Sequence, residues 1–379
     1  MKDNGSICSF PWRAAAIRPN GLTIPCCRYP HIDESDSFVS SPVVRNTAHW
    51  KDLRKKMLKG DKIEGCHGCY QDEANGLHSM RQSSLTKFIP INEEILPIEQ
   101  LEVSFSNLCN LACVHCYSFL SSKWYAEDVK FERMTKIGVL KNDFNFNKWD
   151  LSNLTELKII GGEPLMEPDK FIDLLTNLNL SKIKLQICTN GTILPKPALK
   201  TLIEQCETVF LAVSLDGLNS TNDWYRWPSK FADVVETMRI YEDWWKDNTN
   251  IDLVVHHVVN AVNIFELGDF VEFMEKDFPR WKIEWDWIRW PYWQQLNVFP
   301  STVKNQLISN LQNLDNLYTN KNEKLRPNPY NISIERIQEE SNSNFLELKK
   351  EVIRISKERN LNFLSMVNAF DTIWNEYHE

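Results

Sequence analysis

The chain has 379 residues, of which 42% are hydrophobic and 25% are charged, and its formal net charge is −8. This length can bury a sizeable core and predicts more than one domain. The acidic balance argues against a nucleic-acid partner, because phosphate binding favours basic surfaces, and no apolar stretch approaches the roughly 20 residues that would cross a membrane.

The first candidate site is a set of four cysteines near the amino end: Cys8, Cys26, Cys66 and Cys69. Four thiolates can hold a 4Fe–4S cluster, but a C-x2-C pair is also typical of structural zinc. Both interpretations stay open from the residues alone, and we favour the cluster. Most of the ten cysteines lie at ligand spacings, and thiolates on iron need a reducing compartment. The first ten residues also lack a secretion signal, so we expect a cytoplasmic protein.

The spacing around Gly21 bears on which thiols ligate. Twelve residues separate Cys8 from Gly21, and four separate Gly21 from Cys26. Pro19-Asn20-Gly21 predicts a turn between two short strands. Cys27 is an alternative ligand beside Cys26, and we favour Cys26 because it keeps the spacing from Gly21.

Three domains are predicted, over residues 1–88, 99–299 and 300–379. The proline-bracketed segment 89–98 marks the first boundary, and the polar, leucine-spaced sequence after Pro300 predicts a helical carboxyl-terminal region. Within the first domain, the basic stretch 51–59 predicts the exposed face of an amphipathic helix that ends at Gly60.

The middle domain contains six apolar runs of strand length. They alternate with segments of helical character, which is the pattern of parallel βα units. The runs cover residues 101–106, 157–160, 183–188, 209–213, 253–259 and 283–288.

The segment after the first run is the most informative in the chain. Cys109, Cys113 and Cys116 have the spacing C-x3-C-x2-C, with His115 in the last interval. Three thiolates hold three corners of an iron–sulfur cubane and leave the fourth iron open for a substrate or cofactor. A zinc or buried-thiol cluster is the alternative, and the motifs that follow the next strands disfavour it.

Chemically distinctive residues follow the next three runs. They are Gly161, Gly162, Glu163 and Pro164 after the second run, Thr189, Asn190 and Gly191 at the end of the third, and Ser214, Asp216 and Gly217 after the fourth. The carboxyl ends of parallel strands carry the active sites of α/β barrels. These residues are therefore predicted to share one edge of the sheet.

This order of motifs resembles the radical SAM superfamily. The resemblance implies an α/β fold with a partial (β/α)6 TIM-like barrel and a 4Fe–4S cluster whose open iron binds S-adenosylmethionine (SAM). An external electron donor such as flavodoxin or ferredoxin would supply the electron that cleaves SAM to methionine and a 5′-deoxyadenosyl radical. That radical would then abstract hydrogen from the substrate.

The resemblance also implies roles for single residues toward SAM. His115 would take the ring position of the cysteine motif, and the Gly161–Pro164 segment would face the methionyl ammonium. Ser214 and Asp216 would lie near the ribose and methionyl groups, with Thr189 and Asn190 on the same rim. Arg226 would pair with the SAM carboxylate. The alternatives are an ordinary turn at Asn190-Gly191 and a solvated surface arginine at 226.

The amino-terminal cysteines resemble the twitch domain, which is one half of the SPASM auxiliary-cluster domain. Glu73, Gly76, Ser79 and Arg81 continue a pattern associated with relatives that carry this domain at the amino end. Most relatives carry it after the barrel, so its position here is a departure. The resemblance implies an auxiliary 4Fe–4S cluster that accepts electrons.

The function predicted from this resemblance is modification of a peptide or protein side chain by oxidation, crosslinking or epimerisation. The alternatives are radical chemistry on a small sugar, aminocyclitol or nucleoside, and a non-enzymatic iron–sulfur electron carrier. One catalytic candidate is Cys188, as a hydrogen-atom donor or else an inert thiol. Trp285 and Trp287 alternate on one strand and could line a substrate channel or pack in the core.

Overall fold

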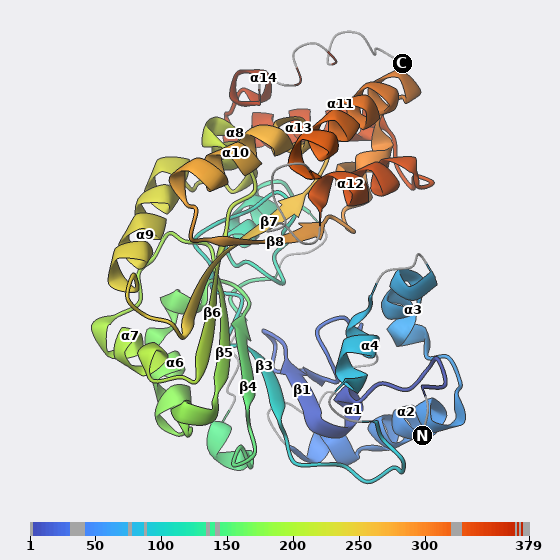
Figure 1. Ribbon diagram of the computed structural model, residues 1–379, viewed down its shortest axis with the longest axis vertical. Coiled ribbons are helices and arrows are strands. Elements are labelled where there is room, and N and C mark those ends of the chain that lie inside the picture. Colours follow the sequence, from blue (N-terminus) through green and yellow to red (C-terminus); the bar gives the residue numbers. More distant parts are fainter. Residues whose placement is uncertain are drawn as a thin grey trace. The chain divides into compact units, whose positions relative to one another are not determined.

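The computed structural model is built around one sheet of eight strands (Figure 1). It describes residues 3–30, 42–74, 78–86, 89–133, 137–140, 145–319, 328–367, 370 and 373; Gly76 lies outside this set. The strands are β1 (Ala14–Ile17), β2 (Thr23–Ile24), β3 (Gln100–Ser104), β4 (Glu156–Ile160), β5 (Lys184–Thr189), β6 (Thr208–Ser214), β7 (Ile251–Val259) and β8 (Lys282–Trp287). Their order is β2-β1-β3-β4-β5-β6-β7-β8, with β2 and β8 as edges, so the sheet is not closed.

The described residues form fourteen α-helices, most of them between or after the strands. They are α1 (Phe10–Arg13), α2 (Ala48–Lys59), α3 (His67–Ala74), α4 (Met80–Leu85), α5 (Trp124–Lys130), α6 (Pro168–Thr176), α7 (Pro197–Glu204), α8 (Asn219–Tyr225), α9 (Phe231–Trp244), α10 (Leu267–Asp277), α11 (Ser301–Thr319), α12 (Pro329–Gln338), α13 (Phe345–Arg359) and α14 (Phe363–Met366). None of the described helices is long and apolar enough to cross a membrane.

The chain divides into two compact units. The first comprises Met1–Cys109, Ser118–Cys188 and Pro195–Phe210, and the second comprises Asn110–Tyr117, Thr189–Leu194 and Leu211–Glu379. In the first unit β3 pairs in parallel with β1 and β4, and β4 with β5; in the second, β7 pairs in parallel with β8. The predicted mixed α/β fold with a partial, mostly parallel barrel sheet is confirmed.

Alternating burial explains why these segments form strands. In β4 and β5 the buried positions are Leu157, Ile159, Leu185 and Ile187, and the residues between them are more exposed. The helices that follow these two strands bury apolar faces of their own, with Phe171 and Leu174 in α6 and Leu199 and Ile203 in α7. A period of two in the strands and of about 3.6 in the helices is the signal that the sequence carries. All six predicted strands are present.

The amino-terminal hairpin contributes two strands that the six-strand expectation did not include. β1 and β2 pair antiparallel around the predicted turn, where Gly21 has φ 83°. β1 also pairs with β3 from Ala14↔Gln100 to Ile17↔Val103. Every residue of β1 is buried, which is typical of a strand inside a parallel sheet rather than at a free edge.

The basic stretch 51–59 lies in α2 as predicted, and Gly60 ends the helix in the left-handed conformation, φ 87°. Its lysines are exposed, but Arg54 does not share their exposed face. Arg54 is 1% exposed, and its guanidinium donates to the Arg45 carbonyl oxygen at 2.9 Å. The prediction that the basic stretch is the exposed face of the helix was therefore wrong at this residue.

The two tryptophans of β8 differ in environment. Trp285 is buried and packs edge-on against His257, with ring centroids 5.2 Å apart, and against Phe270. Trp287 is half-buried, and its indole N–H donates to Ser333 Oγ at 3.0 Å. Trp285 is thus a core residue, which is the second of the two interpretations of this pair.

Candidate functional site

The turn after β4 approaches the chain just before Cys109 in the first unit. Gly161 and Gly162 both have positive φ, 83° and 52°. A Cβ on Gly162 would collide with the Leu108 carbonyl oxygen, so only glycine allows this approach. The Glu163 amide donates to the same carbonyl at 2.7 Å.

Glu163 is 1% exposed, and its carboxylate has a structural partner. Oε1 accepts from the Leu165 amide at 3.0 Å and caps the short 3₁₀ turn that Pro164 begins. On the other side of the approach, the Cys109 amide donates to Ser122 Oγ at 3.2 Å. The backbone before and at the first cysteine is therefore held from two directions.

In the second unit, residues 110–117 form what we call the thiol loop, which carries Cys113 and Cys116. The loop pairs with the end of α8 and the residues just after it: the Ala112 amide donates to the Trp227 carbonyl and the Val114 amide to the Tyr225 carbonyl, both at 2.8 Å. The Cys116 amide donates to the Cys113 carbonyl at 2.9 Å and closes a turn between the two cysteines.

Side chains from the end of β5 hold the start of the thiol loop. Asn190 Nδ2 donates to Asn110 Oδ1, and Asn110 Nδ2 donates to Thr192 Oγ1, both at 2.8 Å. Thr192 Oγ1 in turn donates to Asn190 Oδ1 at 2.6 Å. The chain does turn at Asn190-Gly191, since Gly191 has φ 72°. The same turn also holds the thiol loop through the hydrogen bond from Asn190 to Asn110. Sequence analysis missed Asn110 and Thr192.

A buried ion pair lies beside the loop. Arg226 Nη1 contacts Asp216 Oδ2, and Asp216 Oδ1 accepts from the Val258 amide at 2.8 Å. Burial disfavours the charged carboxylate, but Arg226 and neighbouring histidines outweigh it and lower the pKa of Asp216. Arg226 is 6% exposed, so the alternative of a solvated surface arginine is wrong.

One hydrogen-bond donor of Arg226, its Nε, takes no part in this ion pair. Its Nε is buried and has no hydrogen-bond acceptor among the described residues. A buried donor of this kind usually has a partner, and a carboxylate is the usual one for a guanidinium. The two predicted SAM contacts thus neutralise each other's charge in the fold, while Arg226 retains a donor for a ligand.

His115 stacks on Tyr225, with ring centroids 5.3 Å apart and an interplanar angle of 26°. Its Nδ1 lies 4.0 Å from Asp216 Oδ2 and has no acceptor among the described side chains. Burial lowers the pKa of His115 to about 4, so the ring is neutral near pH 7. Ser214 lies half-buried at the end of β6, and Thr189 is buried at the end of β5.

The four amino-terminal cysteines line one cavity of about 30 Å³ in the first unit, together with Arg28 and Arg81. Burial raises the pKa of the Cys8 thiol to about 11, and burial with the nearby Cys8 and Cys69 thiols raises that of Cys66 to about 12. Both values describe metal-free thiols. No three His, Cys, Asp or Glu side chains in the described parts of the chain are already gathered as ligands of a single metal ion.

Polar groups reach two of these sulfurs. Ser84 Oγ lies 3.4 Å from Cys8 Sγ, and Arg28 Nη1 donates to Cys69 Sγ at 3.7 Å. A cationic donor such as Arg28 stabilises a thiolate, whether that thiolate binds iron or zinc. The donor set therefore fits either group, and the choice between a 4Fe–4S cluster and zinc stays a prediction.

Cys27 lies outside this cavity. Its thiol contacts Met80 Sδ at 3.9 Å, and burial followed by the Glu102 carboxylate raises its pKa to about 11. Cys26 is the member of the pair that lines the cavity, in keeping with the spacing from Gly21. Cys188 is half-buried at the carboxyl-terminal part of β5, and its role as a hydrogen-atom donor stays a prediction.

The Glu73, Ser79 and Arg81 pattern has a physical basis. Arg81 donates from Nε and Nη2 to the two Glu73 carboxylate oxygens at 2.8 and 2.7 Å, and Ser79 Oγ donates to Glu73 at 2.5 Å. Arg81 also donates to the Ile7 carbonyl at 2.9 Å, next to Cys8. The network ties α3, which carries Cys69, to α4 and to the amino-terminal segment.

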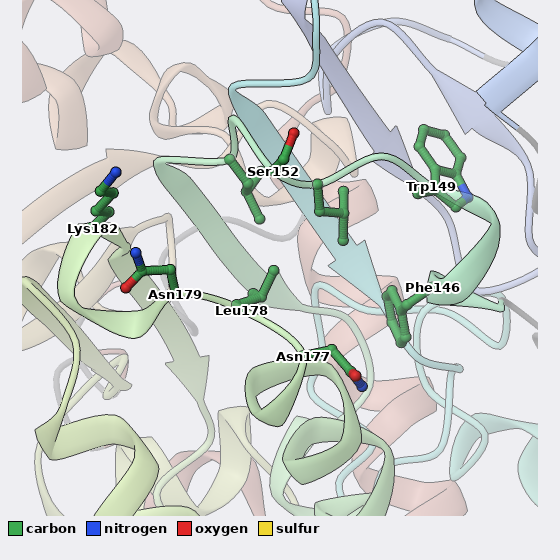
Figure 2. A pocket seen from close by; sticks show the side chains of 9 residues that line it. Phe146, Trp149, Ser152, Asn177, Leu178, Asn179 and Lys182 are labelled. Atoms are coloured by element: carbon green, nitrogen blue, oxygen red, sulfur yellow. The ribbon is translucent and has the colours of Figure 1, made fainter.

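A cavity of about 400 Å³ in the first unit lies elsewhere (Figure 2). Phe146 and Trp149 come from the segment before β4, and Asn177, Asn179 and Lys182 from the segment between α6 and β5. This is the amino-terminal end of both strands, opposite the end that carries Gly161. Since α/β active sites lie at carboxyl-terminal strand ends, we do not assign this cavity to the site.

Comparison with known proteins agrees with the motif order. Residues 103–271 match the family model of the radical SAM superfamily. This segment begins in β3 and ends in α10, so it includes the three-cysteine motif and every residue predicted to face SAM.

Named relatives cover only part of the chain. A Methanocaldococcus jannaschii protein named probable GTP 3′,8-cyclase is 28% identical over 178 residues, which is 46% of this chain and 55% of that protein. AlbA of Bacillus subtilis, named antilisterial bacteriocin subtilosin biosynthesis protein, is 25% identical over 199 residues, 52% of this chain and 41% of AlbA. The chain thus spans about half the length of these curated relatives.

Among solved structures, Streptococcus suis SuiB bound to S-adenosylmethionine aligns with a TM-score of 0.37 and 15% identity. The alignment covers 83% of this chain and 68% of SuiB.

The close approach at Gly162 can be tested by Gly162→Ala. The substitution places a Cβ against the Leu108 carbonyl at a positive φ, so we expect the free energy of unfolding to fall by about 2 kcal/mol or more. Urea unfolding followed by circular dichroism measures it. Gly138→Ala is the control, because its Cβ would meet only the Tyr125 ring at 3.9 Å. Equal stability of the two variants would contradict the close approach.

Asp216→Asn should leave the buried Arg226 without a counter-charge and lower the free energy of unfolding at pH 7 by about 3 kcal/mol or more. The pKa of Asp216 is lowered in the fold, so the pair stabilises the wild type above the pKa of an unfolded aspartate, about 4, and loses this effect as the pH falls. Unfolding midpoints from pH 7 to pH 3 should therefore converge for variant and wild type at the acidic end.

The matched control is Asp243→Asn, which breaks an exposed ion pair with Lys246 and should change the midpoint little at any pH. A constant gap between Asp216→Asn and wild type across the whole pH range would show that the loss is not electrostatic.

Proposed function

We propose, because residues 103–271 match the family model of the radical SAM superfamily, that this chain reductively cleaves SAM and uses the resulting 5′-deoxyadenosyl radical to abstract hydrogen from a peptide or protein side chain. The observation that carries the proposal is the three-cysteine motif at the carboxyl end of β3, with a glycine-specific turn against the residue before its first cysteine. Relatives with cyclase names place the chain among enzymes rather than electron carriers.

Cys109, Cys113 and Cys116 would hold three irons of a 4Fe–4S cluster, which supplies the electron when it is reduced by a donor such as flavodoxin or ferredoxin. The protein's own contribution is to bind and orient SAM. Arg226 would donate Nε to the SAM carboxylate, since that donor is buried and otherwise without an acceptor among the described residues. Asp216 would keep the guanidinium in place through the buried ion pair.

The remaining rim residues are proposed in the same way. Glu163 and the Gly161–Gly162 backbone would face the methionyl ammonium. Asn190 would act through Asn110 to hold the start of the thiol loop, and Ser214 and Thr189 would line the same rim. His115, neutral near pH 7, would lie beside the cluster without adding charge.

The amino-terminal cavity supports an auxiliary site. Cys8, Cys26, Cys66 and Cys69 line it, and polar side chains contact two of its sulfurs. With four thiolates no iron is left to bind substrate, so we propose that an auxiliary 4Fe–4S cluster accepts an electron during a net oxidation. The location we propose is the cytoplasm, where such thiolates stay reduced.

Two relatives suggest different substrates. AlbA, named for bacteriocin biosynthesis, supports a peptide or protein substrate, which we favour. The Methanocaldococcus protein, named as a GTP cyclase, supports the alternative of a nucleotide or another small molecule. GTP itself is the direct probe: conversion of GTP with formation of 5′-deoxyadenosine would replace the peptide proposal.

Anaerobically reconstituted protein should contain about eight irons, as two 4Fe–4S clusters. Replacing Cys109, Cys113 and Cys116 by Ala should remove about half of the iron, because the amino-terminal thiols are untouched. Metal analysis by plasma mass spectrometry measures both proteins. Zinc in place of iron in the triple variant would overturn the auxiliary-cluster proposal.

Dithionite-reduced protein should cleave SAM to 5′-deoxyadenosine, and Arg226→Met should weaken SAM binding about tenfold or more through the lost charged hydrogen bond. Equilibrium dialysis at matched iron content gives the affinity. The control is Cys66→Ala with Cys69→Ala, which should retain SAM cleavage while losing net oxidation of the substrate. Unchanged SAM affinity in Arg226→Met would show that the carboxylate is bound elsewhere.

A further inference from the structure

The carboxyl-terminal helices reach the thiol loop through one arginine. Arg359 is the last residue of α13, 247 positions after Ala112, and its Nη2 donates to the Ala112 carbonyl at 2.8 Å. The side chain is 8% exposed. Ala112 lies immediately before Cys113, so the contact fixes the peptide group that leads into a predicted iron ligand.

The conformation of the carboxyl end of α13 positions the Arg359 side chain. Asn360 follows in the left-handed conformation, φ 56°, and its amide donates to carbonyls of the last turn. The Leu361 amide also donates to the Ser356 carbonyl at 2.8 Å. This closed helix end is the usual way to satisfy terminal carbonyls, and it sets where Arg359 leaves the helix. Buried Leu348, Val352 and Ile355 anchor the rest of α13.

The same guanidinium touches both sides of the loop's backbone pairing. The guanidinium carbon of Arg359, Cζ, lies 4.9 Å from the centroid of the Trp227 ring, within the range of a cation–π contact. Trp227 is also the residue whose carbonyl accepts from the Ala112 amide. Ala112 is therefore held at its N–H by Trp227 and at its C=O by Arg359.

The carboxyl-terminal helices also hold the helix that leads to Arg226. Trp224 Nε1 donates to Ser356 Oγ at 2.9 Å. The Trp224 ring also packs edge-on against the Phe363 ring, with ring centroids 4.8 Å apart. Ser220 Oγ donates to the Met366 carbonyl at 2.7 Å. Thus α13 and α14 contact α8, which leads to Arg226, and α13 also contacts the thiol loop through Arg359.

Charge gives Arg359 a second effect. Its positive charge is held 2.8 Å from the carbonyl oxygen of Ala112, the residue immediately before Cys113. A cation that stabilises a ligating thiolate also favours the reduced, more negative state of a cluster. A neutral residue at 359 would withdraw this effect.

We propose that Arg359 is a positioning residue that holds the Ala112 peptide of the thiol loop and makes the cluster bound there easier to reduce. The inference deepens the proposed function and rests on it only for the second part. The first part concerns the protein chain alone and can be measured without iron.

The positioning part is tested by amide hydrogen exchange of residues 110–117 in the metal-free full chain. Arg359→Met removes the donor and the charge, and Arg359→Lys keeps the charge but lacks the planar fork. Both should exchange about tenfold faster than wild type at the Ala112 and Val114 amides. Arg354→Met is the control: Arg354 is in the same helix, half-exposed, and pairs with Glu351 and Glu358. Unchanged exchange in a folded Arg359→Met protein would overturn the positioning role.

The electronic part is tested by a potentiometric titration followed by electron paramagnetic resonance, in full-length protein with Cys66→Ser and Cys69→Ser so that one cluster is observed. Arg359→Met should lower the equilibrium constant for reduction about tenfold, which is about 59 mV for one electron. Arg359→Lys should stay within about threefold of wild type. An unchanged potential in Arg359→Met would reject the charge effect.

Failure of the inference and failure of the proposed function are distinguishable. If the thiol loop of the wild type binds no redox-active cluster, the proposed function fails, and the exchange measurement still decides the positioning role. If Arg359→Met does not fold, Arg359→Lys carries the exchange test, because it removes the fork while keeping the charge.

Discussion

The buried ion pair between Asp216 and Arg226 is the interaction on which the described site depends. Burying two opposite charges costs free energy unless they are paired and hydrogen-bonded. Here the Val258 amide donates a hydrogen bond to the second oxygen of the Asp216 carboxylate. The strand–helix connection after β6 and the end of α8 are thereby held at a fixed separation. The segment 225–227, which begins at the last residue of α8, is also the partner of the thiol loop, so the position of Cys113 follows from where Arg226 is held.

Much of the fold follows from local sequence signals. The strands were predictable because their apolar residues recur with a period of two, and the turn after β4 because only glycine tolerates its backbone geometry. The spacing from Gly21 favoured Cys26 over Cys27, and Cys26 is the one that lines the cavity. Each of these signals lies within about a dozen residues of the feature that it predicts.

The parts that were missed depend on residues far apart in the chain. Asn110 meets Asn190 and Thr192 some 80 positions later, and Arg359 meets Ala112 across 247 positions. An asparagine in a loop or an arginine at a helix end has an ordinary local explanation, so neither stands out in the sequence. Arg54 shows the converse, since a cation in a basic stretch is buried because backbone carbonyls satisfy it.

The parallel pairing of β1 with β3 has a consequence for dissecting this protein. Leu101 and Val103 of β3 are buried, and β1 occupies the hydrogen-bonding edge on one side of that strand. A shortened protein lacking the amino-terminal hairpin would present this edge, with its open row of N–H and C=O groups, to other molecules. Such edges recruit further strands and lead to aggregation. The amino-terminal segment therefore also covers that edge of the barrel sheet, whatever metal its cysteines bind.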